Sequence, residues 1–276
     1  MKSIAALAPA RTMLGHQLAG IFQIEVARTL RGGRTLFACL LAALPITLFA
    51  ARLVLPAHPH FLQNAGEITG LFAILFQTFF LRLLIFFGCV ALFMGSFRGE
   101  IAEKTLHYYL LCPIRREALV AGKFLSGTVA ATAIFGSSVG LSYLLIFASP
   151  PGLLESYVLN GPGKWHLLAY LLVTAMACAG YGALFLTLGL FFRNPIIPAA
   201  VVLGWESINF LLPSFLKKIS IVYYLDSLCP VPISQGPIAI LSEPAPFWIA
   251  APGLLAVTVV LLLIASLRLR SGRVEL

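Results

Sequence analysis

Six long apolar segments, separated by short polar stretches, constrain this chain more than any other feature of its sequence. They lie at about residues 35–55, 69–97, 124–148, 166–192, 196–215 and 247–267. Each has the roughly 20 residues that an α-helix needs to cross the hydrocarbon core of a bilayer. The sequence therefore predicts an all-α polytopic membrane protein with six transmembrane helices, in a single domain over residues 1–276.

Composition supports the bilayer as the solvent around this chain. The sequence is 60% hydrophobic and 11% charged, and a soluble domain of this size could not bury so much apolar surface. The net charge of +9 is also found in nucleic-acid-binding proteins, but here the basic residues collect at the ends of the apolar segments. There they meet anionic headgroups, so we expect the lipid bilayer, and no nucleic acid, as a partner.

The distribution of lysine and arginine predicts the orientation. With the N-terminus inside, most of these residues fall on cytoplasmic segments, as the positive-inside rule requires. The external segments then carry only Arg52, Lys164, Lys217 and Lys218. We expect both termini in the cytoplasm and the chain in the cell inner membrane.

Two segments outside the spans have a pattern of their own. Residues 12–33 carry apolar side chains every four residues beside basic ones, which predicts an amphipathic helix in the cytoplasmic interface; the alternative is a cytoplasmic helix packed on a partner. Residues 216–246 are rich in proline yet apolar. We expect short helices or a re-entrant hairpin there, capping the external mouth, because irregular backbone at membrane depth must be buried in protein.

The 98–123 segment, between the second and third predicted spans, carries an ordered set of residues. In sequence order they are Glu100, Thr105-Leu106, Leu110-Leu111, Pro113, Arg116 and Gly122-Lys123. This order, entering a span at its end, resembles the permeases of the ABC type-2 transporter family. The stretch before the first span resembles the amphipathic connecting helix of that family, with Glu25 and the basic residues Arg28, Arg31 and Arg34.

The resemblance implies a permease half that pairs in the membrane with a second copy or with a related chain, of which we favour the homodimer, and that docks on two copies of a separate ATPase subunit. It also implies a cytoplasmic coupling helix in the 98–123 segment; the alternative is a solvated loop that only sets topology. The residues assigned to ATPase coupling are Glu100, Glu103, Thr105, Leu106, Tyr109, Leu110, Pro113 and Arg116. Those assigned to the interfacial helix are Glu25, Arg28 and Arg31.

The chain itself is not expected to be an enzyme. The stretch from Gly99 to Thr105 lacks the second glycine of a P-loop, so its backbone cannot form a phosphate cradle. We expect ATP and Mg to bind in the partner subunit, and no cofactor in this chain. His58 and His60 lack a third ligand, so no metal site is predicted.

Two ionisable residues lie about midway along predicted spans, Arg82 in the second and Glu206 in the fifth. A lone charge at this depth is costly and normally faces a partner or an aqueous path, so we expect the two to pair within one subunit or across a dimer. The resemblance implies that both spans line the translocation path, with Gln77, Trp205 and Asn209 as neighbours. A structural salt bridge, a gate and a proton or ion relay stay open, although no further Asp, Glu or His continues a relay.

The sequence thus favours a permease that exports a hydrophobic or amphipathic substrate by alternating access. Two alternatives remain. One is an ion-coupled secondary carrier that needs no ATPase, and the other is a membrane anchor or assembly subunit that transports nothing.

Overall fold

Every regular element in the described part of the chain is a helix. The computed structural model describes residues 20–23, 25–26, 28–29, 32–54, 64–102, 116–192, 194, 196–208, 214–217, 219–231 and 246–270. Five helices there are long and apolar enough to cross a membrane, over Gly33–Leu53, Ala65–Phe97, Arg116–Ala148, Gly163–Phe191 and Phe247–Arg270. The prediction of an all-α protein with several transmembrane helices is confirmed to this extent.

The helices follow the apolar segments of the sequence. The first is α2 (Gly33–Val54), and the second span is one continuous helical rod made of α3 (Ala65–Leu75), η1 (Phe76–Ile85), α4 (Phe86–Cys89), η2 (Val90–Met94) and α5 (Gly95–Ala102). Then come α7 (Arg116–Ala148), η3 (Leu154–Leu159), α8 (Gly163–Phe191), α9 (Ile196–Ile208), α10 (Ser214–Lys217), α11 (Ile221–Leu228) and α12 (Phe247–Arg270). The η elements are π-helical, a form that is rare and often found near functional sites.

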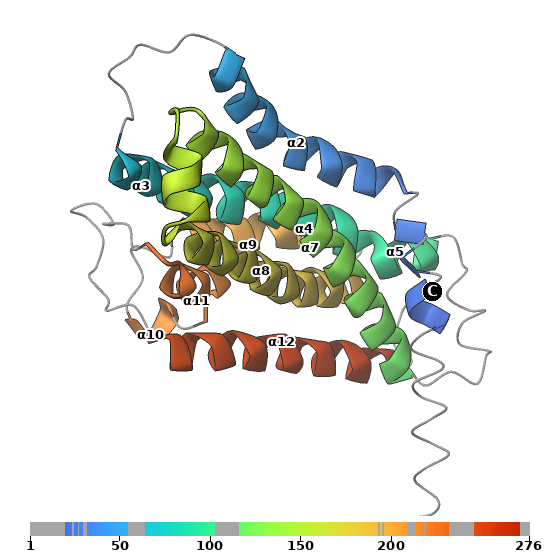
Figure 1. Ribbon diagram of the computed structural model, residues 1–276. Helices are drawn as coiled ribbons and strands as arrows, with labels where there is room; N and C mark the ends of the chain where they lie inside the picture. The colour runs from blue at the N-terminus through green and yellow to red at the C-terminus, as the bar shows by residue number, and fades with distance from the viewer. Residues whose placement is uncertain are drawn as a thin grey trace, which may run out of the picture.

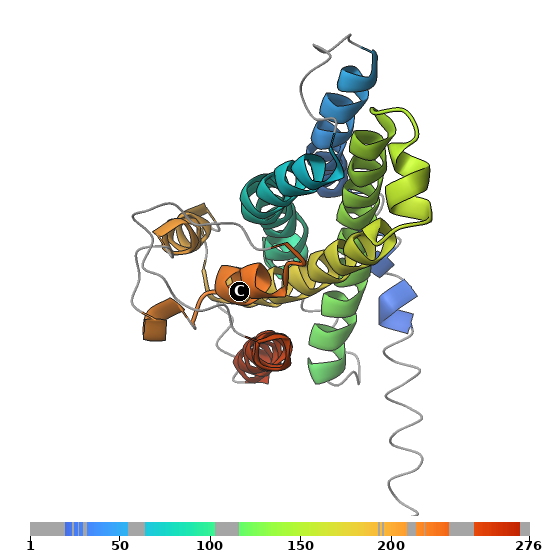
Figure 2. The ribbon, with the colours of Figure 1, turned by 60° about the vertical axis from the view of Figure 1, so that its left-hand side comes forward.

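The bundle is built around α8, which packs against α7, α12, α11 and the second span (Figures 1 and 2). Of the most apolar stretch of α8, 61% is buried, against 22% for α2 and 17% for α12. The outer helices therefore present most of their apolar surface outward, as expected for helices that face lipid or a second copy. Figure 2 shows α9 standing at the edge of the bundle.

The bundle has two distinct ends. At one end α2 begins, α5 ends, α7 begins and α12 ends (right-hand side of Figure 1). Beside them lie residues 20–23, 25–26 and 28–29, which are helical and which we call the N-terminal helical residues. We call this end of the bundle the basic end, because Arg28, Arg34, Arg116 and Arg270 lie there. At the opposite end η3 lies over the turn between α7 and α8, and α11 lies between α8 and α12.

Aromatic rings and glycines hold the second span against its neighbours. The Phe72 ring meets Tyr143 of α7 edge-on, with centroids 5.0 Å apart, and Tyr170 of α8 at 5.1 Å. A Cβ added at Gly88 would stand 1.9 Å from Phe135 Cζ, and one at Gly189 would stand 2.6 Å from the Met94 carbonyl oxygen. These contacts need glycine, because no larger residue fits without moving a helix.

The structure adds two details at the boundaries of the predicted spans. Helix α7 begins at Arg116, so the last part of the 98–123 segment is already the first turns of the third span. The second span has 33 residues over Ala65–Phe97, well above the roughly 20 that a helix needs to cross a hydrocarbon core. A helix of this length in a bilayer must tilt or project beyond the core.

Candidate functional site

Four polar side chains from four different helices gather inside the bundle. Tyr181 of α8 and Glu206 of α9 are buried, Arg82 of η1 and Asp226 of α11 are half-buried, and we call the four the buried charged cluster. Tyr181 lies within electrostatic range of the other three. Burial of several ionisable groups between apolar helices is costly unless they satisfy one another, so their pairing decides what this site can do.

The ion partner of Arg82 is Asp226. Arg82 Nη2 lies 3.3 Å from Asp226 Oδ2, and the two side chains are 30% and 16% exposed. Within the described chain, Arg82 thus pairs with Asp226 and not with Glu206 as predicted. Glu206 is still close enough for an electrostatic interaction with Arg82. The sequence did contain a signal for Asp226, which is the one carboxylate in the otherwise apolar stretch 221–228.

The Glu206 carboxylate is hydrogen-bonded to the N-terminus of α11. Its carboxylate accepts hydrogen bonds from the Ser220 hydroxyl, from the Ile221 amide at 3.1 Å and from the Val222 amide at 3.2 Å. The first amides of a helix lack partners within the helix, and the helix dipole favours a negative charge there. Glu206 is thus the N-terminal cap of α11, which explains why Arg82 pairs with Asp226 instead.

Within the cluster, the described hydrogen bonds leave three buried polar atoms without a partner. They are Nε of Arg82, Oδ1 of Asp226 and the Tyr181 hydroxyl. Asp226 therefore has a spare acceptor oxygen in the same cluster as a hydroxyl that can donate or accept. Such an arrangement can bind a proton, a cation or water in the interior of the bundle.

The other residues assigned to the path are divided between the interior and the surface. Gln77 is buried and donates from Nε2 to the Val231 carbonyl oxygen at 3.0 Å, so that it joins η1 to the segment after α11. Trp205 is 36% exposed, although its neighbour Glu206 is buried. Asn209 lies outside the described residues.

A buried ion pair joins the N-terminal helical residues to the third span at the basic end. Lys123 Nζ lies 2.7 Å from Glu25 Oε1, and the two side chains are 0% and 6% exposed. The same ammonium group stands 5.3 Å from the centroid of the Phe97 ring, which adds a cation–π contact from α5. One lysine therefore connects residues 20–29, α5 and α7.

The beginning of α7 is also attached to the end of α12. Arg116 Nη1 donates to the carbonyl oxygens of Leu269 at 2.6 Å and Arg270 at 3.0 Å. These carbonyls belong to the last turn of α12, where a helix lacks internal donors and favours a cation. The Arg270 side chain returns to Glu117, with Nη1 and Oε1 3.3 Å apart, although this second pair is exposed.

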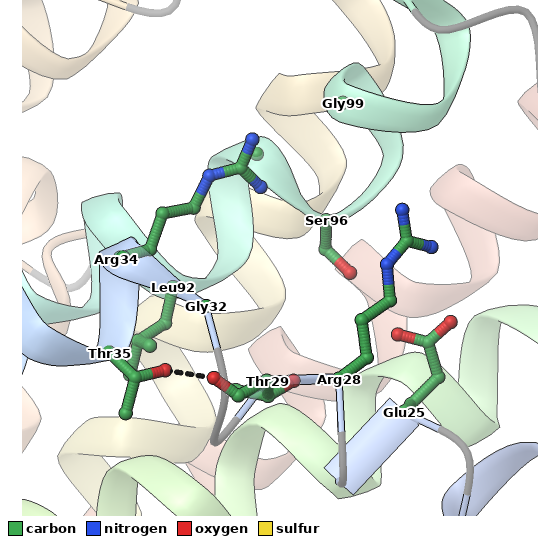
Figure 3. Close-up of a pocket in the computed structure, with 11 residues that line it drawn as sticks. Glu25, Arg28, Thr29, Gly32, Arg34, Thr35, Leu92, Ser96 and Gly99 are labelled. Atoms are coloured by element: carbon green, nitrogen blue, oxygen red, sulfur yellow. Dashed lines mark hydrogen bonds between the residues drawn. The ribbon is translucent and has the colours of Figure 1, made fainter.

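A cavity of about 210 Å³ opens beside the buried ion pair, between the N-terminal helical residues, the beginning of α2 and α5 (Figure 3). Arg28 and Arg34 extend toward it from two sides, and Glu25 lies beneath Arg28. Its floor is formed by Gly32 and Thr35, whose hydroxyl donates to the Thr29 carbonyl oxygen.

Most of the residues assigned to ATPase coupling lie outside the described chain. They are Glu103, Thr105, Leu106, Tyr109, Leu110 and Pro113, together with Arg31 of the interfacial helix and the side chain of Glu100. Within the described residues, no group of three or more His, Cys, Asp or Glu side chains could hold a metal ion. A scan of protein-family models finds no match to this chain, and a search of curated proteins finds no similar sequence.

Proposed function

We propose that this chain is the membrane-spanning permease subunit of an ATP-driven ABC transporter of the type-2 family, working as a dimer on two ATPase subunits. It exports a hydrophobic or amphipathic substrate by alternating access across the cell inner membrane. The observation that carries the proposal is the buried Glu25–Lys123 pair. It fixes the N-terminal helical residues to the third span at the point where the 98–123 segment ends.

This connection suits a mechanical role. A partner that moves the 98–123 segment would pull directly on α5 and α7, which flank it. Through Lys123 the same motion reaches the N-terminal helical residues, and through Arg116 it reaches the end of α12. Four elements then move as one block, which is what rigid-body transmission from an ATPase requires.

A layout of six spans with both termini in the cytoplasm agrees with the course of the chain. Phe191, at the end of α8, lies under the Arg268 guanidinium of the basic end, 5.0 Å away. Gly253, near the beginning of α12, lies against Tyr224 of α11. These two contacts lie at opposite ends of the bundle, which supports a crossing between α8 and α12, and we assign that crossing to the fifth predicted span, which contains α9.

A second candidate function is an ion-coupled carrier, which the buried charged cluster favours. The sequence argued against a relay because only Arg82 and Glu206 were found, whereas Asp226 and Tyr181 now join them. Two carboxylates around one guanidinium can exchange a proton or a cation with the aqueous phase. This carrier would need a gradient and no ATPase.

The deciding experiment purifies the full chain from its native membrane under mild cross-linking and identifies what accompanies it. We expect a nucleotide-binding subunit to co-purify and to hydrolyse ATP. Glu100→Ala combined with Leu106→Asp should abolish this association, whereas Glu155→Gln, in η3 at the opposite end of the bundle, should leave it unchanged.

The two functions differ in their energy source. If no nucleotide-binding partner is found and uptake into proteoliposomes follows a proton or ion gradient, the permease proposal is wrong and the carrier stands. If a partner is found but the 98–123 double variant keeps it and its ATP hydrolysis unchanged, this segment is not the coupling element.

A further inference from the structure

We propose that the cavity at the basic end binds a phosphate group, of the kind carried by an anionic phospholipid headgroup or by a soluble phosphate ester. The cavity lies between the N-terminal helical residues, the beginning of α2 and α5. The proposal rests on the charge, shape and surroundings of this cavity, and it does not depend on the transport function proposed above.

The charge of the cavity is positive. Arg28 and Arg34 line it, and Glu25 is the one carboxylate among its described lining residues. That carboxylate lies 2.7 Å from the buried Lys123 ammonium, so it already has a cation of its own. The two guanidinium groups are the charged groups that suit a phosphate, because a guanidinium matches phosphate oxygens with two parallel hydrogen bonds.

Glycines of α5 let Arg34 reach the cavity. A Cβ added at Gly95 would stand 2.2 Å from Arg34 Nη1 and 2.3 Å from its Cζ, and one at Gly99 would stand 3.1 Å from Nη2. The guanidinium therefore lies flat on the backbone of α5, in the orientation visible in Figure 3. Any side chain at Gly95 would displace it, so this glycine positions the arginine.

The size and the backbone of the cavity fit a small anion. At about 210 Å³ it is smaller than the roughly 300–1,000 Å³ of sites for drug-sized ligands. Helix α2 begins at Gly33 on the wall of the cavity. The first turn of a helix directs backbone N–H groups and a partial positive charge toward an anion placed before it.

The surroundings of the cavity favour a lipid as the source of the phosphate. Helix α2 leads away from the cavity with large apolar side chains outward, and Leu36 and Leu40 are 65% and 64% exposed. A headgroup in the cavity would place its acyl chains along this face of α2. The lipid would then fill the space beside the N-terminal helical residues and stabilise the block of helices at the basic end.

The test uses the purified full chain in a neutral detergent and measures both the unfolding midpoint and retained lipid by native mass spectrometry. The probes are short-chain phosphatidylglycerol, phosphatidylcholine of equal chain length, and inorganic phosphate, with sodium chloride at matched ionic strength. We expect phosphatidylglycerol to bind and to raise the midpoint. The double variant Arg28→Gln/Arg34→Gln should bind it at least about a hundredfold more weakly, since a charge-assisted hydrogen bond is lost at each of the two positions.

Two further variants separate binding from folding. Gly95→Ala keeps every charge but displaces Arg34, and it should weaken phosphatidylglycerol binding in a chain that still folds. Arg270→Gln removes a cation from the same end outside the cavity, and it should bind as the native chain does. Protection by inorganic phosphate would show that the phosphate site also accepts a soluble source, whereas protection by phosphatidylglycerol alone would identify the lipid. Equal binding of phosphatidylcholine, or unchanged binding in the double variant and Gly95→Ala, would overturn the proposal.

Discussion

The molecule contains two buried ionic sites whose pairing differs. At the basic end, Lys123 and Glu25 form an ion pair at 2.7 Å, with almost no exposed side-chain surface. In the buried charged cluster, Arg82 pairs with Asp226 while Glu206 caps α11, and Arg82 and Asp226 each keep a buried polar atom without a hydrogen bond among the described residues. The first site is balanced in charge, and the second is not.

This difference distinguishes a structural ion pair, which holds helices together, from a site that can change its hydrogen bonds when a ligand or proton binds. A matched buried pair between elements far apart in the sequence holds one geometry, because either charge alone would be left uncompensated. A cluster with spare acceptors can change its hydrogen bonds when a proton, an ion or a substrate arrives. If the proposed transport function holds, we expect the basic end to transmit force and the cluster to respond to cargo.

The largest effect is expected from breaking the matched pair. Lys123→Met leaves the Glu25 carboxylate buried without its cation, and it should lower the free energy of unfolding by about 3–5 kcal/mol. The unfolding midpoint of the purified chain, followed by intrinsic fluorescence in detergent, measures this loss.

Two further variants test the cause of that loss. Replacing both residues, Glu25→Met with Lys123→Met, should recover most of it, because a buried pair exchanged for apolar side chains is often neutral. Glu117→Ala breaks the exposed Glu117–Arg270 pair and should cost less than about 1 kcal/mol. If Lys123→Met lowers the free energy of unfolding no more than Glu117→Ala does, the Glu25–Lys123 pair does not stabilise the bundle.

Sequence reasoning predicted the five long apolar helices that the described chain contains, but not the contacts between them. Long apolar segments report membrane helices directly, and Arg82 and Glu206 stood out because they interrupt such segments. Asp226 was missed because it lies in a segment predicted to be an external cap, and its depth follows only from the packing of α11 on α8 and α12. The Glu25–Lys123 pair joins residues so far apart in sequence that no local pattern could indicate it.

Glycine spacing shows the same limit. Gly136 and Gly140 form a small-residue motif expected to bring helices together, yet a Cβ at either would meet only Leu171, at 3.8 and 4.0 Å. The close approaches are made instead by glycines without a recognisable spacing, such as Gly88 and Gly189. Which glycine is needed depends on the partner helix, and this information is tertiary.

Substitutions in the buried charged cluster are expected to lower the free energy of unfolding by an intermediate amount. Asp226→Asn removes the charge that faces Arg82, and the weakened hydrogen bond should cost about 1.5–3 kcal/mol in the unfolding midpoint experiment. Tyr181→Phe is the matched test, since the Tyr181 hydroxyl has no hydrogen-bond partner among the described residues, and it should leave stability within about 0.5 kcal/mol.

The same two variants decide whether the cluster only holds helices together. A structural cluster predicts that transport falls in Asp226→Asn in proportion to stability and is unchanged in Tyr181→Phe. Loss of transport in Tyr181→Phe at native stability would place the cluster on the path of an ion or substrate.

The smallest stability effect is expected at Arg116, and it tests the transmission assigned to the basic end. Arg116→Gln weakens the cap on the last carbonyls of α12, which should cost about 0.3–1 kcal/mol. If α7 and α12 move together only through this arginine, ATP hydrolysis by the partner should continue while transport per ATP falls. Arg270→Gln keeps the Arg116 cap, which reaches the Arg270 main chain rather than its side chain, and it should leave the ratio unchanged. If transport per ATP is the same in both variants, α12 moves with α7 through apolar packing and not through Arg116. The ionic connection in the moving helices would then be the Glu25–Lys123 pair.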